Sequence, residues 1–458
     1  MHIGPDGATR LLVVAASALL SACGKPVETS AAEKLPDTPI FYVDAAAGSD
    51  TNHGRTAKAP FKTLNRAAGA VKPGWTVQVM GGTYTSDGTE NPLTVSVSGT
   101  SAAWITFTAA PGHHPVIQIP RGPGAWAGIH LFGVSYVVID GFEVIGQNTT
   151  ITPAEAAAND GTQAFLNHNC VYVDGVGYAN VHPPVAHDIV IRNSILHDCA
   201  AAGIEVNAAD AITIEHNRVY NNSWWTVFGT SGIGFYHLTD ARGSTTKNGY
   251  KNFVVGNLSW GNRNNIEFKA GHPPAIYDGN GIIVDDSMHT QSALGANDVK
   301  GVPYTGRTYV ANNVVHDNGG RGIHLYRSEH VDVVNNTVWN NMLSSSTYIQ
   351  SGEIDALDST DVNVINNVAV NLVGKDVTYD DGNHYDYNLW DGARVPFKWG
   401  HDIAGRANLT DPANGNFAPA AGSPALRSGT STLAPTDDLL GNPRPAGAID
   451  RGAIQVSH

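Results

Sequence analysis

The sequence predicts an all-β protein, a right-handed parallel β-helix with a short helix capping its N-terminal end. The first observation behind this prediction is a unit of about 23 residues in which asparagine follows a β-branched strand. The second is a recurring strand that glycine introduces and isoleucine begins. The third is length, because 458 residues are many for one compact core, whereas stacked repeats escape that limit.

Residues 1–22 are predicted to be a signal peptide. Arg10 precedes the apolar run 11–20, which has the size of a signal-peptide core and is too short to span a bilayer. We find no second apolar run long enough to cross a membrane. The sequence therefore predicts an exported protein.

The motif LSAC, which ends at Cys23, resembles a bacterial lipobox and predicts that Cys23 is lipidated. The alternative is an ordinary secretory signal with an incidental cysteine. Gly24, in place of aspartate, is typical of lipoproteins sent to the outer membrane. We therefore expect a lipoprotein that its lipid anchor alone holds at that membrane. Residues 23–39, small, polar and proline-containing, read as a flexible tether.

The charge of the chain restricts its partners. The net charge is −14, and only 15% of residues are charged. Nucleic acids bind basic patches, so a nucleic-acid partner is not expected. An acidic surface also argues against tight binding of a polyanion unless a cation bridges the two. We expect a monomer whose partner is a polysaccharide.

Asparagine marks six copies of the repeat, each after a short strand of valine and isoleucine. A β-helix coil turns sharply between its strands, and asparagine tolerates the left-handed backbone that such turns use. Stacked asparagines can also hydrogen-bond along the axis as a ladder. The predicted ladder consists of Asn193, Asn217, Asn257, Asn313, Asn336 and Asn367.

A second repeated piece predicts one sheet of the solenoid. In each copy glycine makes a turn, an isoleucine is buried, and the next side chain faces outward because strand side chains alternate. The predicted buried residues are Ile204, Ile233, Ile282, Ile323 and Ile354.

The two ends of the solenoid read differently from its coils. Residues 40–410 are predicted to form the β-helix itself. Near its start, a short helix begins close to Thr63 and breaks at Pro73-Gly74, where it would cap the first coil. Residues 411–458 are rich in proline and glycine and are predicted to close the far end.

Two cysteines remain after the lipobox. Cys170 precedes a strand-like run and Cys199 lies in a turn-like run, so we predict two separate small buried residues. A disulfide between them is the alternative, which export would permit.

The opening stretch carries a resemblance to a known family. YVD at 42–44, PFKTL at 60–64 and GGTY at 81–84, together with YVVIDGFEV at 136–144, resemble bacterial pectate-lyase-like β-helix proteins. Polysaccharide lyases of family 9, several glycoside hydrolases and proteins without known activity share this pattern. The resemblance implies a lysine base and a calcium cluster in an Asp-Asp-Gly-Phe-Asp run. This sequence has no such run, so no residue is carried over.

Insertions predict a groove over the strands at 231–237, 280–286 and 321–327. Extra residues precede and follow these strands, and solenoid insertions build the binding face. The predicted substrate-binding residues are Glu205, Tyr236, Tyr326 and Asp355, with Trp224 and Trp225 in a wall loop. The tryptophans could stack on sugar rings or pack beneath their loop.

Asp285 and Asp286 are the most suggestive pair in this groove. With Glu267 or Asp278 nearby, they could hold Ca²⁺, which prefers several oxygen ligands. One of the pair could instead act as a general acid in hydrolysis. A third interpretation is a turn-forming aspartate that caps backbone amides.

Lys269 is predicted as a catalytic base from the longest wall loop. A lyase removes the proton alpha to a uronate carboxylate and needs a cation to stabilise the resulting anion. A solvated surface lysine is the alternative. His324 and Arg327 join Lys269 and Asp285 as catalytic candidates, because they lie in or beside the floor strands.

Three functions follow from this sequence. The first is a Ca²⁺-assisted polysaccharide lyase that acts on an acidic glycan by β-elimination. The second is a glycoside hydrolase that uses two of the groove carboxylates. The third is a surface β-helix that binds glycans without catalysis. The net charge weakens the first, and the insertions over one sheet weaken the third.

Overall fold

The computed structural model describes residues 38–176, 184–241, 249–291, 301–344, 351–380, 382–395 and 399–457, which belong to one compact unit. The predicted signal peptide, Cys23 and the tether up to residue 37 lie outside the described residues. Within the described part of the chain, no helix is long and apolar enough to cross a membrane.

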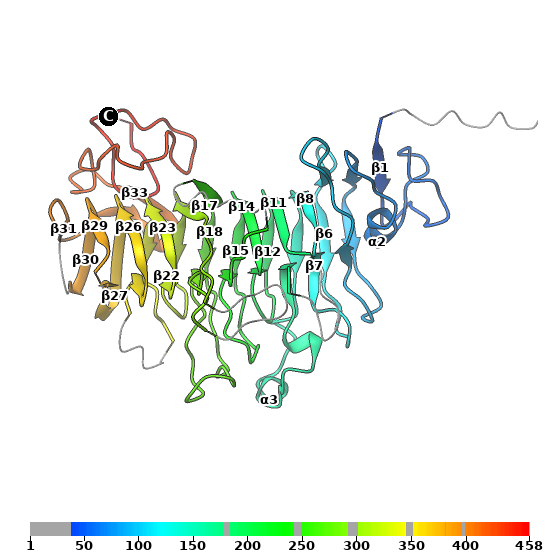
Figure 1. Cartoon of the computed structure of the whole chain (residues 1–458), viewed down its shortest axis with the longest axis horizontal. Coiled ribbons are helices and arrows are strands. Elements are labelled where there is room, and N and C mark those ends of the chain that lie inside the picture. Colours follow the sequence, from blue (N-terminus) through cyan, green and yellow to red (C-terminus); the bar gives the residue numbers. More distant parts are fainter. Residues whose placement is uncertain are drawn as a thin grey trace, which may run out of the picture. The chain divides into compact units, whose positions relative to one another are not determined.

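Three long parallel sheets wind around one core and form the predicted right-handed parallel β-helix (Figure 1). Along the chain each coil adds a strand to sheet C, then to sheet A, then to sheet B. Sheet A consists of β1 (Ile40–Val43), β2 (Thr76–Val79), β5 (Ile105–Ala109), β8 (Ser135–Asp140), β11 (Ala186–Arg192), β14 (Ala209–Glu215), β17 (Tyr250–Val255), β20 (Arg307–Ala311), β23 (Glu329–Val334), β26 (Thr360–Ile365) and β29 (His384–Asp386).

Sheets B and C complete each coil. Sheet B consists of β3 (Gly82–Tyr84), β6 (Pro115–Gln118), β9 (Glu143–Ile145), β12 (Ile195–His197), β15 (Arg218–Tyr220), β18 (Leu258–Trp260), β21 (Val314–His316), β24 (Thr337–Trp339), β27 (Val368–Asp376), β30 (Leu389–Arg394) and β31 (Ile403–Ala404). Sheet C consists of β4 (Leu93–Val95), β7 (Ala127–Phe132), β10 (Asn169–Asp174), β13 (Ile204–Asn207), β16 (Ile233–Tyr236), β19 (Ile282–Asp285), β22 (Ile323–Tyr326), β25 (Ile354–Leu357) and β28 (Thr378–Asp380).

The predicted isoleucine row is confirmed on sheet C. The five isoleucines pair in register from β13 to β25 and are fully buried. They belong to one continuous apolar core that runs through the coils. Because side chains alternate along a strand, the residue after each of these isoleucines faces outward.

The asparagine ladder is confirmed with one correction. Asn217 Oδ1 accepts from the backbone N–H of Ser194 in the preceding coil, and Asn217 Nδ2 donates to the next asparagine of the ladder. The same side-chain hydrogen bonds continue along the axis through Asn257, Asn313, Asn336, Asn367 and Asn388. The prediction of Asn193 was wrong by one residue, because Ser194 occupies the ladder position. Asn193 instead takes the positive φ of 52° at the turn and bonds Asp140 on the surface.

A second asparagine ladder follows sheet B. It links Asn222, Asn262, Asn318 and Asn341 through Nδ2 to Oδ1 hydrogen bonds of 2.9 to 3.1 Å. At its end the Asn341 Nδ2 donates to Glu353 Oε2 at 2.7 Å, and Asn371 Nδ2 donates to Glu353 Oε1 at 3.0 Å. Glu353 is fully buried, so a carboxyl group ends a ladder of amides inside the protein.

Cys170 and Cys199 form a disulfide, so the prediction of two separate cysteines was wrong. Their Cα atoms lie 5.6 Å apart, within bonding reach, because β10 and the turn after β12 meet inside the solenoid. Both residues are fully buried. The bond joins two neighbouring coils across 29 residues of sequence.

The segments before and after the repeated coils pack against the solenoid. Helix α2 (Leu64–Ala68) begins after the N-cap Thr63, as predicted, and buries Leu64 in the core. Beyond β31, the segment with β32 (Leu409–Asp411), η2 (Pro412–Asn414) and β33 (Asn416–Pro419) leads into a chain that packs beside β23 and β26 (Figure 1). Asn335 donates to Asp450 O at 3.0 Å there. This segment therefore covers the side of the last coils.

A wall loop stands beside sheet C between β9 and β10. It contains helix α3 (Pro153–Ala157), which a complete capping box with Thr152 begins, and the short helix η1 (Ala164–Leu166). Its apolar residues, including Ile151 and Leu166, pack with Trp225 of another loop into a small cluster outside the main core. The loops beside sheet C are therefore packed structures in their own right.

Candidate active site

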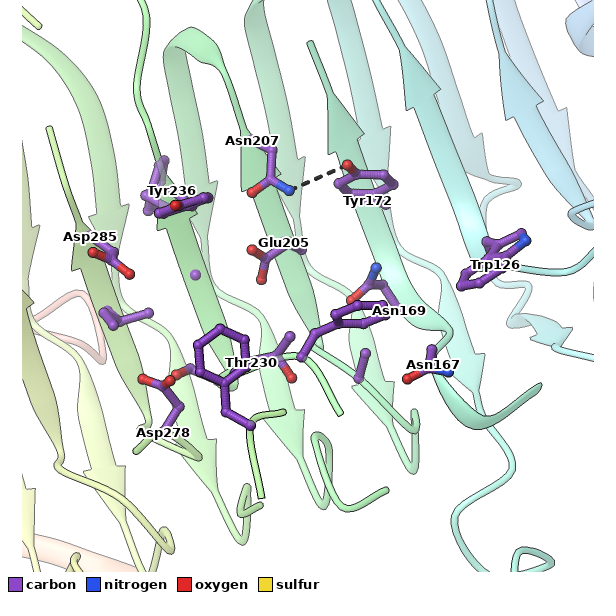
Figure 2. Close-up of a pocket in the computed structure, with 18 of the residues that line it drawn as sticks. Trp126, Asn167, Asn169, Tyr172, Glu205, Asn207, Thr230, Tyr236, Asp278 and Asp285 are labelled. Carbon is purple, nitrogen blue, oxygen red and sulfur yellow. Dashed lines mark hydrogen bonds between the residues drawn. The ribbon is translucent and has the colours of Figure 1, made fainter. Parts of the chain in front are cut away.

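A cavity of about 480 Å³ lies on the outward face of sheet C, over β10, β13, β16 and β19 (Figure 2). Loops that follow or precede these strands form its walls. The lining residues are Trp126, Asn167, Asn169, Tyr172, Ala201, Glu205, Asn207, Phe228, Gly229, Thr230, Ser231, Gly234, Phe235, Tyr236, Phe268, Asp278, Ile283, Asp285 and Gln291. The cavity overlaps the predicted groove at β16 and β19 and extends from there toward the N-terminal coils.

Three carboxyl side chains meet in this cavity. Glu205 faces outward from β13 and Asp285 from β19, while Asp278 enters from the loop before β19 (Figure 2). The strand between them, β16, places Gly234 in register with Glu205 and with Ile283. The floor between the carboxylates is therefore low and apolar.

Two glycines make room for these carboxyl groups. A Cβ atom at Gly234 would lie 2.8 Å from Glu205 Oε2, and one at Gly229 would lie 2.4 Å from Asp278 Oδ2. Any other residue at either position would displace the carboxylate beside it. The glycines thus allow the backbone to approach the carboxyl groups closely.

The environment of the cavity shifts the pKa values of the three acids by different amounts. Burial, and then the charge of Asp278, raises the pKa of Glu205 to about 8. Burial and the charges of Asp278 and Asp286 raise the pKa of Asp285 well above its ordinary value. Burial also raises the pKa of Asp278, but His324 and Arg321 and a hydrogen bond from Asn280 oppose that rise. Asp278 is therefore the group best placed to carry the negative charge.

Hydrogen bonds hold the flanking acids in place. Gln291 Nε2 donates to Asp285 Oδ1 at 2.7 Å. Asn207 lies 3.3 Å from the Tyr172 hydroxyl (Figure 2), and with its amide oxygen turned to Tyr172 its nitrogen donates to Glu205 Oε1 at 3.0 Å. The carboxyl groups are thus oriented before any ligand enters.

Aromatic rings form the walls of the cavity. Trp126, Tyr172 and Tyr236 line it from the strands of sheet C and the turn before them, and Phe228 and Phe268 line it from loops. Phe228 is 44% exposed, so its ring is accessible to a ligand. Such rings offer flat apolar surfaces to the faces of sugar rings.

Four residues named from the sequence lie in the cavity: Glu205, Tyr236, Asp285 and Asp278, the last of which was named as a candidate calcium ligand. Asp286 does not, because its carboxylate accepts from Thr290 and Gln291 at 2.8 Å and pairs with His237 at 2.9 Å. Burial opposes these bonds, but together they lower the pKa of Asp286. Of the three interpretations of Asp286, the turn-forming cap matches its position.

The predicted calcium ligands are not gathered in one place among the described residues. Among the described residues, no three His, Cys, Asp or Glu side chains are placed to share a metal ion. Asp286 is engaged by its turn, and Glu267 is exposed on a wall loop outside the cavity lining. The structure therefore does not bring Asp285, Asp286 and Glu267 together as predicted.

Lys269 lies outside the cavity lining, although its neighbour Phe268 belongs to it. The Lys269 ammonium donates to the carbonyl oxygen of Asn159 in the loop after α3. The predicted base is thus bonded to a wall loop and does not line the cavity that contains the three acids. No lysine or arginine occurs among the described residues that line the cavity.

Trp224 and Trp225 also lie outside the cavity lining. Trp224 Nε1 donates to Gly261 O at 3.1 Å, and Trp225 Nε1 donates to Asn148 O at 3.0 Å. Trp225 packs in the apolar cluster beside α3. The structure matches the interpretation that these rings support their loop.

The remaining predicted residues lie at the C-terminal side of the cavity. His324 and Asp355 are buried, in register on β22 and β25, and their Nδ1 and Oδ1 atoms are 2.5 Å apart. Tyr326 pairs in register with Asp285. Arg327 stacks over Tyr326, 4.9 Å from its ring centre, and lies 3.6 Å from Asp358. None of these four lines the cavity.

Sequence reasoning missed four aromatic residues of the site: Trp126, Tyr172, Phe228 and Phe268. The alternation of β10 could have indicated Tyr172, since it lies in register with Glu205. The loop residues carry no comparable signal, because a loop side chain has no fixed period that gives its direction.

Comparison with known proteins identifies the family. Residues 127–369, more than half of the chain, match the family model described as right handed beta helix region. The chain therefore belongs to the family of right-handed β-helix proteins. No curated protein matches the sequence.

Several solved structures are similar to this chain. A structure of pectate lyase Pel9A is similar over 92% of this chain and 98% of its own, at 17% identity and a TM-score of 0.56. A rhamnogalacturonan lyase is similar over 81% and 90%, at 16% identity and a TM-score of 0.48. A lacto-N-biosidase from Eubacterium ramulus is similar over 76% and 55%, at 16% identity and a TM-score of 0.41. The likeness to Pel9A confirms the expected fold, whereas the chemistry depends on the cavity.

Proposed function

We propose that the protein is a glycoside hydrolase that cuts a neutral polysaccharide in the cavity on sheet C. The observation that carries the proposal is the cluster of Glu205, Asp278 and Asp285 within aromatic walls that contain no described lysine or arginine. Glycosidases generally use two carboxyl groups in different protonation states. An acidic substrate would bring further negative charge to this cluster without a cation opposite it.

The three acids take different roles in this proposal. Glu205, with a pKa of about 8, is protonated at neutral pH and donates its proton to the glycosidic oxygen. Asp278, whose ionisation His324 and Arg321 favour, is the carboxylate that activates water or attacks the sugar. Asp285, whose pKa burial and the neighbouring charges raise well above its ordinary value, forms a hydrogen bond with a substrate hydroxyl.

A lyase is less well supported by the cavity. β-Elimination needs a base and a cation opposite the uronate carboxylate. Lys269 is bound to Asn159, and no described basic residue lines the cavity. A purely binding protein is also less well supported, because recessing three acids costs free energy that sugar binding alone does not require.

The test begins with the purified protein and a panel of neutral and acidic polysaccharides, with and without a chelator. We expect new reducing ends on a neutral glycan, no absorbance at about 235 nm from unsaturated products of β-elimination, and no effect of chelator. Unsaturated products from an acidic glycan, lost on chelation, would refute the hydrolase and establish the calcium-assisted lyase. Activity on no member of the panel would favour the binding protein.

Variants then assign the roles. Glu205→Gln and Asp278→Asn should each lower kcat by about a hundredfold or more, the usual contribution of general acid–base catalysis. An aryl glycoside whose leaving group needs no proton should restore the rate of Glu205→Gln but not that of Asp278→Asn. Glu215→Gln, on the outer face of sheet A, is the matched control. Equal rates for all variants would show that the cavity is not the site.

The pH profile gives a second test. Glu205 must be protonated to act as an acid, so the rate should fall as the pH rises above about 8. Asp278 must be ionised, so the rate should also fall on the acid side. A rate that rises steadily through pH 8 would contradict the assignment of Glu205.

We further propose that the protein is exported and anchored by a lipid at Cys23. The lipobox motif supports the anchor. The Cys170–Cys199 disulfide supports export, because disulfides persist in oxidising compartments.

A further inference from the structure

A buried ionic cluster lies behind the proposed site, at the C-terminal side of the cavity. Asp355 Oδ2 accepts from Arg321 Nε at 3.0 Å, and Asp355 Oδ1 is 2.5 Å from His324 Nδ1. All three side chains are buried, with Asp355 fully so. A buried carboxylate with two basic partners is costly to assemble, so the arrangement invites a functional explanation.

The cluster is attached to the loop that carries Asp278. Arg321 Nη1 donates to Tyr277 O at 2.9 Å, directly before Asp278. The backbone N–H of Arg321 donates to Asn280 Oδ1 at 2.8 Å, and Asn280 Nδ2 donates to Asp278 Oδ1 at 3.0 Å. Arg321 thus holds the loop on both sides of Asp278.

We propose that Arg321, Asp355 and His324 form a clamp that positions the Asp278 carboxylate and keeps it ionised for the reaction. Arg321 fixes the loop and supplies a positive charge, His324 lies beside it on β22, and Asp355 orients both side chains from the neighbouring strand. None of the three lines the cavity, so they are positioning residues that act through Asp278. The inference rests on the proposed role of Asp278 in hydrolysis.

The charges around Asp278 agree with this geometry. The charge of Asp278 raises the pKa of Glu205 on β13 and of Asp285 on β19, so these acids interact with it, whereas His324 and Arg321 favour its ionisation. Burial raises the pKa of Asp278, and His324, then Arg321, lower it. Without the clamp, the hydrogen bond from Asn280 would still favour the ionised form, but the electrostatic contributions of His324 and Arg321 would be lost and Asp278 would hold its proton at higher pH.

The first experiment compares pH–rate profiles of the wild type with those of Arg321→Gln, Arg321→Lys and His324→Gln on the hydrolysed glycan. For Arg321→Gln and His324→Gln the acid limb of kcat should move upward by about half a pH unit or more, with KM little changed. Arg321→Lys should restore much of the limb because it restores the charge. An unshifted acid limb in both neutral variants would overturn the clamp.

Arg307→Gln is the matched control for damage to the fold. Arg307 forms a similarly buried pair with Asp332 on sheet A, with Nη2 and Oδ1 2.8 Å apart. Its loss should lower thermal stability without moving the acid limb. An equal shift in Arg307→Gln would show that the effect in Arg321→Gln is merely structural, and would overturn the proposal.

A second experiment needs no activity. The unfolding transitions of the wild type, Asp278→Asn, Arg321→Gln and the double variant form a cycle at neutral pH. If Arg321 stabilises the Asp278 charge, the change in unfolding free energy caused by Asp278→Asn should differ clearly between the Arg321→Gln background and the wild-type background. Additive shifts would overturn the clamp even in an active hydrolase. Coupling in a protein that hydrolyses no glycan would retain the clamp and remove only the proposed function.

Discussion

Replacing Glu353 by glutamine should change how stability depends on pH. Glu353 ends the second asparagine ladder, fully buried, and accepts from the backbone N–H of Asn341 at 3.0 Å and from the side chains of Asn341 and Asn371. Burial raises the pKa of Glu353 from 4.5 to about 7, although these hydrogen bonds oppose the rise. The folded protein therefore holds a proton that the unfolded chain releases at lower pH.

The sign and the size follow from that difference. Because the pKa is raised in the folded state, the stabilisation is fully present below pH 4.5 and is lost as the pH rises to about 7. A rise from 4.5 to about 7, at about 1.4 kcal/mol per pH unit, corresponds to about 3 kcal/mol. Glutamine does not titrate, so Glu353→Gln should lack this loss. Its amide also meets an asparagine donor, which should cost about 1–3 kcal/mol at every pH.

The assay is urea unfolding of the wild type and Glu353→Gln from pH 4.5 to 8 at constant ionic strength. The difference between their free energies of unfolding should shift by about 3 kcal/mol in favour of Glu353→Gln across this range. Glu215→Gln, on the outer face of sheet A, should run parallel to the wild type. Parallel curves for Glu353→Gln would refute the argument and show that an ionised carboxylate ends the ladder.

Three further predictions concern the ladder, the site and the anchor. Asn313→Ala should cost about 2–4 kcal/mol in urea unfolding because it leaves several buried ladder groups unpaired, whereas Asn193→Ala, off the ladder, should cost less than about 1 kcal/mol; equal costs would contradict the ladder register. Gly234→Ala should lower kcat/KM without lowering the melting temperature, because its Cβ would meet the Glu205 carboxylate at 2.8 Å; unchanged kinetics would place the reaction elsewhere. Cys23→Ala should release the protein from the membrane fraction, and an unmutated protein found wholly in the soluble fraction would contradict lipidation.

The repeated coil could be predicted because each coil of the solenoid requires the same residue types at the same positions. A buried isoleucine after glycine, and an amide at the start of sheet B, recur wherever a coil stacks on the last. The register slipped at Asn193 because two polar residues stand side by side there. The turn position before the ladder also favours asparagine, since it takes a positive φ, so residue type alone could not separate Asn193 from Ser194.

The disulfide and the loop side chains required the third dimension. Cys170 and Cys199 are 29 residues apart, and insertions of unknown course hid the fact that they meet inside neighbouring coils. Phe268 and Lys269 are adjacent in sequence, yet one lines the cavity and the other bonds Asn159. That division depends on how one loop packs against another, which no local pattern records.

Asp285 and Asp286 show why the cavity lies where it does. Asp285, the last residue of β19, faces outward into the cavity, whereas Asp286 takes a φ of 51° at the turn and caps the amides that follow. Inward positions of a coil fill the core and turn positions satisfy backbone groups, so only outward positions are free to carry chemistry. Sheet B has outward positions too, but there Tyr220 and Trp260 stack on each other, 4.4 Å apart. Among the described residues, long wall loops stand over sheet C beside outward acids and rings. The insertions, rather than the repeated coil, therefore determine the location of the site.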